Sequence, residues 1–241
     1  MATQANIAPS ERAGVRSWFK KLLTFWTLIV LVSAFAIGIF ADVGEDVAEH
    51  STTAFDNTAR SWFISHQNPI VYKIAYVLTW AGSPTVMVAI ALLAGLWFYK
   101  RRGRSKAGVL VAAPAIGGLV SGVVKLLYGR ARPPGAALFN EKTFSFPSGH
   151  AATSAAVVVT LCYVLARERM ISWPVAIVVG ALVPLVVGLT RLYLDVHWTT
   201  DVVGGWGVGL FVAALSAALY EYMVRSAPPS VDNVQEAPPL S

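Results

Sequence analysis

The chain has 241 residues, of which 56% are hydrophobic and only 13% are charged, with a formal net charge of +6. Several uninterrupted apolar runs approach the roughly 20 residues that a helix needs to cross a bilayer, which excludes a soluble globular fold and predicts an all-α integral membrane protein. The excess of Lys and Arg lies at the ends of these runs rather than on one soluble face, so no nucleic-acid partner is expected. The single cysteine, Cys162, permits no intrachain disulfide.

Six membrane-spanning helices are predicted within one domain, residues 18–225. The predicted spans are residues 22–41, 84–99 with a turn or two before them, 107–128, 148–166, 173–193 and 199–224. Residues 1–17 and the proline-rich tail, residues 226–241, are expected to be disordered. The first run could be a signal peptide cleaved near Ala36, but it continues to spanning length, which favours a transmembrane helix.

Two segments do not have the pattern of a single straight membrane-spanning helix. Residues 42–68 space acidic residues among large apolar ones, which indicates a helical segment lying in the membrane interface. Residues 69–99 are apolar for longer than one straight span requires. Gly82-Ser83-Pro84 interrupts them at a point where a helix is expected to bend or restart.

The Lys and Arg residues are divided unevenly between the two sides of the membrane. Twelve of the nineteen fall at the N-terminus, in the hairpin at residues 100–106, in the turn after residue 166 and at Arg225; the other side holds seven, together with eight of the thirteen acidic residues. Because cytoplasmic loops carry the excess of Lys and Arg, both termini are predicted to be cytoplasmic, in the cell's inner (plasma) membrane. The connections between spans three and four and between spans five and six then face outward.

Those two outward connections hold three short motifs made of cations, imidazoles and a carboxylate. They are Lys125 with Arg132 and Pro133; Pro147-Ser148-Gly149-His150; and Arg191 with His197 and Asp201. The set resembles the type 2 phosphatidic acid phosphatase superfamily, whose motifs read K-x6-R-P, P-S-G-H and S-R-x5-H-x3-D. One letter departs, because Thr190 stands where the family usually has Ser. The resemblance implies a helical-bundle core shared with the vanadate-dependent haloperoxidases.

The residue types suit phosphoryl transfer, in which catalysis is mostly positioning and stabilisation of spreading negative charge. Three cations, Lys125, Arg132 and Arg191, can surround a tetrahedral anion. Ser148 is expected to cap the helix that follows, and the backbone N–H groups near Gly149 are expected to face the phosphate. No metal or other cofactor is expected, since no acidic cluster has the make-up of a magnesium site.

Two imidazoles indicate a two-step covalent route. His197 is predicted to be the nucleophile, and Asp201, four residues later, to orient its ring and stabilise the charge that develops on it. His150 is predicted to protonate the leaving oxygen and later to activate water. The resemblance implies the same roles. His50 and His66 are interpreted as surface residues, and no role is assigned to Arg130 or Asp195.

A site at the outer membrane face, on a chain without a soluble domain, favours a lipid phosphate or diphosphate held in the bilayer. The resemblance points first to undecaprenyl diphosphate or phosphatidylglycerophosphate, with phosphatidate and lipid A phosphate as further substrates of the family. Four readings stay open: a hydrolase, a lipid phosphotransferase, a non-catalytic lipid-binding or transport protein, and a vanadate-dependent haloperoxidase. The sequence does not predict an oligomeric state.

Overall fold

The structure, a computed structural model, describes residues 9–139 and 141–225. Within them are eight α-helices, one short 3-10 helix and no strand, which confirms the all-α prediction. In chain order they are α1 (Pro9–Ala48), α2 (Thr53–Ser65), α3 (Pro69–Ala81), α4 (Pro84–Arg102), α5 (Arg104–Tyr128), η1 (Pro134–Phe139), α6 (Gly149–Arg167), α7 (Trp173–Tyr193) and α8 (Thr199–Arg225).

Five single helices, α1, α5, α6, α7 and α8, have the length and composition to cross a membrane. The pair α3 and α4, bent by 44° at their junction, makes a sixth span when it is counted as one, which is consistent with the predicted six; the predicted second span, residues 84–99, qualifies only together with α3. The break lies at the predicted place: α3 ends before Gly82, and Ser83 caps α4 by accepting a hydrogen bond from the N–H of Val86 at 3.3 Å. Pro84 occupies the first turn of α4, where its missing N–H costs nothing.

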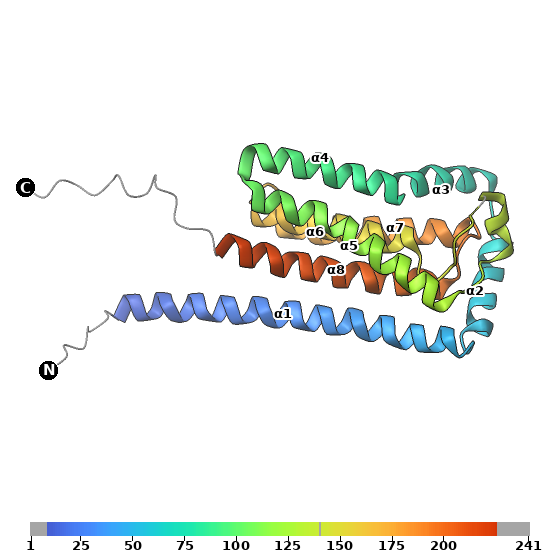
Figure 1. The fold of residues 1–241 in the computed structure, drawn as a ribbon, viewed down its shortest axis with the longest axis horizontal. Coiled ribbons are helices and arrows are strands. Elements are labelled where there is room, and N and C mark those ends of the chain that lie inside the picture. The colour runs from blue at the N-terminus through green and yellow to red at the C-terminus, as the bar shows by residue number, and fades with distance from the viewer. Residues whose placement is uncertain (1–8, 140, 226–241) are drawn as a thin grey trace, which may run out of the picture.

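The N-terminal third differs from the prediction in two ways. Residues 9–17, expected to be disordered, are part of α1, and α1 continues past residue 41 to Ala48. The predicted interfacial segment therefore shrinks to α2, which lies across the end of the bundle (Figure 1). The rest of the predicted disordered termini lies outside the described residues.

Helix α8 packs most extensively against α6 and α1 and lies between α1 and the rest of the bundle (Figure 1). Small residues let α8 approach α6 closely, as is common between membrane helices. A Cβ atom added at Gly205 would lie 2.7 Å from the carbonyl oxygen of Ser148, and one at Gly209 would lie 2.5 Å from that of Ala152. This contact places the start of α6 directly against the first turns of α8.

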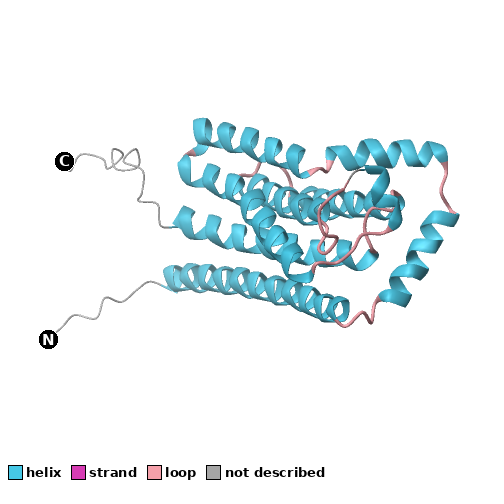
Figure 2. Ribbon diagram, turned by 45° about the vertical axis from the view of Figure 1, so that its right-hand side comes forward, coloured by secondary structure: helices cyan, strands magenta, loops and turns pink. Residues whose placement is uncertain are grey.

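The two ends of the bundle have different structures. At one end the α4–α5 turn, the end of α6 and the end of α8 meet, and α1 begins there as well (Figure 1). At the other end lie α2, η1 and the irregular connections α5–α6 and α7–α8 (Figure 2). All three sequence motifs belong to this second end.

Candidate active site

Backbone hydrogen bonds tie the three motifs together. Helix α5 ends at Tyr128, and the next residue, Gly129, has a left-handed φ of 57° that turns the chain away and an N–H that donates to the carbonyl of Lys125 at 3.0 Å. The N–H of Ser145 then donates to the carbonyl of Arg130, and the N–H of Ser148 donates to that of Asp201, both at 2.8 Å. Segments far apart in sequence are thereby held at one place.

The predicted pair of His197 and Asp201 is present and buried. His197 Nδ1 lies 3.2 Å from Asp201 Oδ2, although His197 precedes α8 and only Asp201 is in its first turn. The N–H of Trp198 also donates to Asp201 Oδ2, at 2.9 Å. A third donor, the hydroxyl of the buried Ser145, bonds to the same oxygen and lies 3.4 Å from His197 Nδ1.

Arg132 defines the tautomer of His197. Arg132 Nη1 lies 3.0 Å from His197 Nε2, and because a guanidinium can only donate, Nε2 is the acceptor. The ring proton is then on Nδ1, where it donates to Asp201. The lone pair of Nε2 therefore points toward the cation that is expected to bind phosphate, and attack on phosphorus would require Arg132 Nη1 to release it.

Glu141 pairs with both predicted phosphate-binding arginines. Its carboxylate lies 3.2 Å from Arg132 Nη2 and 2.7 Å from Arg191 Nη2. Arg191 is buried, donates to Thr79 Oγ1 at 3.1 Å, and keeps a buried Nε without a hydrogen-bond partner. The third predicted cation, Lys125, donates from Nζ to the carbonyl of Ser145 at 3.2 Å. Two arginines thus converge on one carboxylate.

Burial and the surrounding charges set the ionisation of the groups in the connections. Burial lowers the pKa of His197 to about 3, against the opposing effect of Asp201, so the ring is neutral at pH 7. Burial alone would raise the pKa of Glu141, but the charges of Arg132 and Arg191 outweigh it and hold that pKa below its usual value. Glu141 is therefore an anion between two cations.

His150 lies in the first turn of α6 and lines a cavity of about 620 Å³ together with Arg191 and Glu141. Exposed aromatic and aliphatic side chains complete the lining, among them Trp80 and Leu138. His150 is also within electrostatic reach of His197, Arg132, Lys125 and Arg191. All eight predicted site residues belong to this end of the bundle.

One detail of the predicted site is wrong. Ser148 occupies the N-cap position of α6, but its side chain makes no capping bond, and its buried Oγ has no hydrogen-bond partner. Instead, the backbone N–H of Ser148 donates to the carbonyl of Asp201 in α8 and fixes the residue there. Thr190, which stands where the family usually has Ser, donates from its hydroxyl to the carbonyl of Val187 at 2.6 Å.

Sequence reasoning missed four side chains that complete this network: Asp56, Arg130, Glu141 and Ser145. Arg130 and Ser145 lie within or just before the motifs, so their position offered a weak signal. Asp56 and Glu141 offered none, because Asp56 belongs to α2 and Glu141 to an irregular loop. The described residues contain no group of three or more His, Cys, Asp or Glu placed to hold a metal ion.

The segment that contains the three motifs also matches a known protein family. The model of the PAP2 superfamily matches residues 106–225, which contain all three motifs. The chain belongs to the PAP2 superfamily. It is therefore a multi-pass membrane phosphatase, that is, a phosphoric-ester hydrolase.

Curated relatives carry names of several phosphatases. Phosphatidylglycerophosphatase B of Bacillus subtilis is 28% identical over 66% of this chain and 80% of its own. The undecaprenyl-diphosphatase BcrC of the same organism is 27% identical over 63% and 76%. A lipid A 1-phosphatase of Porphyromonas gingivalis is 34% identical over 52% of this chain, but only 27% of its own length.

A solved structure shares the fold. The crystal structure of a transmembrane PAP2 type phosphatidylglycerolphosphate phosphatase from Bacillus subtilis aligns with a TM-score of 0.74 at 24% identity. The alignment covers 81% of this chain and 98% of that one. It supports the helical-bundle fold.

Proposed function

We propose that this enzyme hydrolyses a lipid phosphate or diphosphate at the outer face of the membrane, through a phosphohistidine intermediate. The observation that carries the proposal is the buried pair of His197 and Asp201, with the unprotonated Nε2 of His197 facing Arg132. Asp201 orients the neutral imidazole through Nδ1, and the unprotonated Nε2 faces the cation that is proposed to bind the phosphate. This arrangement suits attack of Nε2 on a phosphorus atom.

The reaction is proposed to run in two steps that balance. His197 Nε2 forms a bond to phosphorus, the bond from phosphorus to the leaving oxygen breaks, and that oxygen takes a proton from His150. Water then attacks the phosphohistidine, the phosphorus–nitrogen bond breaks, and His150 accepts the proton of the water. Asp201 stabilises the imidazolium character of His197 in the first step.

The three cations are proposed to hold the phosphate group. Arg132 and Arg191 already bind a carboxylate, Glu141, and a phosphate presents the same kind of oxygen in greater number. Lys125 adds a point charge, and the start of α6 at Gly149 adds backbone N–H groups. These contacts oppose the charge that spreads over the oxygens during transfer.

A lipid substrate is supported by the surroundings of His150. Its cavity is lined by Tyr76, Trp80 and Leu138, which are exposed apolar side chains at membrane-spanning or adjoining segments. A polar pocket with such a wall suits a phosphate whose tail stays in the bilayer. Among lipids, undecaprenyl diphosphate and phosphatidylglycerophosphate are favoured, because two relatives are named for them.

The test is phosphate release by the purified full chain in detergent. Undecaprenyl diphosphate, phosphatidylglycerophosphate, phosphatidate and lipid A phosphate are compared, with EDTA present and absent. We expect turnover of at least one lipid, unaffected by EDTA, and a loss of about 1,000-fold or more in kcat for His197→Ala. His66→Ala, at an exposed imidazole on the end of α2, serves as the matched control and should retain activity.

Three results would contradict the proposal. Retained activity in His197→Ala would exclude the covalent route. Transfer of the phosphate to a second lipid rather than to water would make the enzyme a phosphotransferase, since only the acceptor differs. Halide oxidation with added vanadate, without phosphate release, would indicate haloperoxidase chemistry instead.

A further inference from the structure

Arg130, a residue to which the sequence motifs assign no role, binds two buried carboxylates at once. Arg130 Nη1 donates to Asp201 Oδ1 at 2.7 Å, and Nη2 donates to Asp56 Oδ2 at 2.6 Å. Asp201 and Asp56 are both almost fully buried, and the Arg130 side chain is 16% exposed. A planar guanidinium with two parallel N–H groups is the side chain suited to bridge two carboxylates in this way.

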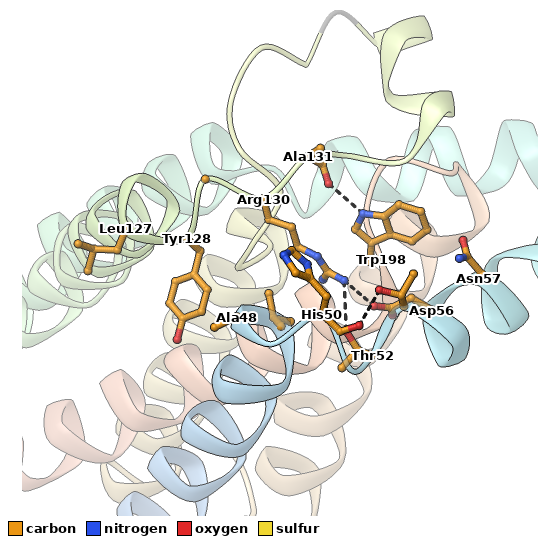
Figure 3. A pocket seen from close by; sticks show the side chains of 13 residues that line it. Ala48, His50, Thr52, Asp56, Asn57, Leu127, Tyr128, Arg130, Ala131 and Trp198 are labelled. Carbon is orange, nitrogen blue, oxygen red and sulfur yellow. Dashed lines mark hydrogen bonds and ion pairs between the residues drawn. The ribbon is translucent and has the colours of Figure 1, made fainter.

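Thr200 closes the network between α2 and α8. Its N–H donates to Asp56 Oδ1 at 3.1 Å, and its hydroxyl lies 2.7 Å from both Asp56 Oδ2 and Arg130 Nη1. Arg130 is also covered by the ring of Trp198, whose centroid lies 5.7 Å from the guanidinium carbon. Figure 3 shows Arg130 between Asp56, Thr52 and Trp198, in the wall of a cavity of about 560 Å³.

The two oxygens of Asp201 are therefore used differently. Oδ1 faces Arg130, while Oδ2 accepts from Trp198 N and Ser145 and faces His197 Nδ1. Because the Arg130 guanidinium binds Oδ1 and is itself anchored by Asp56, it opposes rotation of the Asp201 carboxylate about its Cβ–Cγ bond. Oδ2 then stays in the plane where it can accept the Nδ1 proton of His197.

We infer that Arg130, anchored by Asp56 of α2, is a positioning residue that holds Asp201 in the orientation that keeps the ring proton of His197 on Nδ1 and leaves Nε2 unprotonated. The inference rests on the proposed function and deepens it. Asp56 lies outside the segment that matches the superfamily model, residues 106–225. Helix α2 thus contributes to the reaction by supplying the anchor of this arginine.

Charge gives Arg130 a second effect on the same pair. A buried carboxylate without a countercharge attracts a proton to the imidazole beside it. The other titratable groups near the pair of His197 and Asp201 are Lys125 of α5, Arg132 and Glu141 of the α5–α6 connection, His150 of α6 and Arg191 of α7. Among the described residues, Arg130 is the cation that forms an ion pair with Asp201 besides His197. Loss of Arg130 should therefore leave His197 protonated more often at neutral pH.

The test combines kinetics and a double-mutant cycle on the lipid substrate of highest turnover. We expect Arg130→Gln to lower kcat by about 100-fold with KM changed less than about threefold, Arg130→Lys to recover part of the loss, and Asp56→Asn to lower kcat less. Asp201→Asn should lower kcat at least as much as Arg130→Gln. The double variant with both changes should lose no more than Asp201→Asn alone, because Arg130 acts through Asp201.

Arg167→Gln is the matched control. Arg167 likewise binds a buried carboxylate of α8, with its Nη2 at 3.0 Å from Glu221 Oε2, but at the opposite end of the helix. Like Arg130→Gln, the Arg167→Gln substitution removes one positive charge and an ion pair with a buried carboxylate. We expect a comparable loss of thermal stability and an unchanged kcat.

A second measurement does not depend on activity. In protein labelled with ¹⁵N-histidine, the ring signals of His197, assigned with His197→Gln, should report a neutral ring protonated at Nδ1 in the unmodified chain at pH 7. Arg130→Gln should shift them toward the imidazolium form, and Arg167→Gln should not. Unchanged signals in a folded Arg130→Gln protein, or additive kinetic losses in the cycle, would overturn the inference.

These outcomes separate the two proposals. If no lipid phosphate is hydrolysed by the unmodified chain, the proposed function fails and the ring signals still decide the role of Arg130. If hydrolysis depends on His197 but not on Arg130, the proposed function stands and the inference fails.

Discussion

At the scale of single residues, Glu141 occupies the place that a phosphate oxygen is proposed to take. Its carboxylate contacts Arg132 and Arg191 together, at 3.2 and 2.7 Å. A substrate phosphate that binds both arginines must displace this carboxylate or share the arginines with it. Since the two arginines stay charged, the displaced Glu141 loses a charge-assisted hydrogen bond to Arg191 and an ion pair with Arg132. Substrate binding therefore competes with an internal anion.

Removal of that internal anion should strengthen phosphate binding. We expect Glu141→Gln to lower the inhibition constant of inorganic phosphate about tenfold, which corresponds to about 1.4 kcal/mol, and to enlarge the stabilisation that phosphate gives in thermal unfolding. Lys142→Gln, at the exposed neighbouring residue, is the control and should weaken phosphate inhibition little or not at all. An unchanged inhibition constant in Glu141→Gln would mean that phosphate binds elsewhere.

The buried His197 should make stability depend on pH. Its pKa is lowered to about 3 in the folded chain, whereas an unfolded histidine has a pKa of about 6.5. Between these values the unfolded chain binds one proton more, so stability falls as the pH drops below 6.5. From pH 7 to pH 5 this contribution amounts to about 2 kcal/mol.

The measurement is thermal unfolding in detergent of the unmodified chain and of His197→Gln, whose amide does not titrate. The stability difference between the two should shift against the unmodified chain by about 2 kcal/mol on going from pH 7 to pH 5. Parallel curves over that range would show that His197 is already protonated or exposed. Other titrating groups contribute equally to both proteins.

The sequence predicted the chemistry-bearing side chains and the pairing of Asp201 with His197, but not the other contacts that orient them. The spacing of Lys125, Arg132, His150, Arg191 and His197 is recorded in the motifs. The position of Glu141 depends on the path of an irregular loop, which no periodicity determines. Thr190 shows the same limit: its hydroxyl was visible in the sequence, but its bond to Val187 depends on the turn of α7.

At the scale of the helices, close packing of α6 on α8 aligns the motifs. Gly205 lies against the carbonyl of Ser148 and the Cβ atom of Ala151. The N–H of Ser148 donates to the carbonyl of Asp201 in the same region. The start of α6 and the start of α8 are thus fixed to each other within hydrogen-bond distance.

A methyl group at Gly205 should disturb this alignment. Its Cβ atom would lie 2.7 Å from the carbonyl oxygen of Ser148 and 2.9 Å from Ala151 Cβ, so the helices must separate. We expect Gly205→Ala to cost about 1–3 kcal/mol of stability and to lower kcat, measured by thermal unfolding and phosphate release. Gly118→Ala in α5, where no atom lies within 4 Å, should change neither. Equal behaviour of the two variants would contradict the role of this contact.

The lengths of the helices were less predictable than their number. Six spans followed from apolar length, and the break at Gly82 followed from its local residues. Helix α1 continues through Asp42, Glu45 and Asp46 because these acidic residues lie at its exposed end, where water replaces lipid. A hydropathy pattern marks the edge of the bilayer and not the end of the helix.

At the scale of the whole molecule, α8 is held by ion pairs at both ends. At the site end, Asp201 binds Arg130. At the opposite end, Glu221 accepts hydrogen bonds from Tyr163 and Arg225, and Glu168 pairs with Lys106 at 2.6 Å. The second set joins α5, α6 and α8 where the basic residues gather, so the charges that define the predicted cytoplasmic side also hold that end together.

The predicted orientation can be tested with single cysteines. Cys162 is buried, so the unmodified chain should react little with a membrane-impermeant maleimide in intact cells. Lys142→Cys, in an exposed position beside the site, should be labelled from outside. Arg101→Cys, exposed near the α4–α5 turn, should be labelled only after the membrane is permeabilised. Because the two residues lie at opposite ends of one bundle, reversed labelling would place the phosphatase site on the cytoplasmic face and its substrate in the inner leaflet.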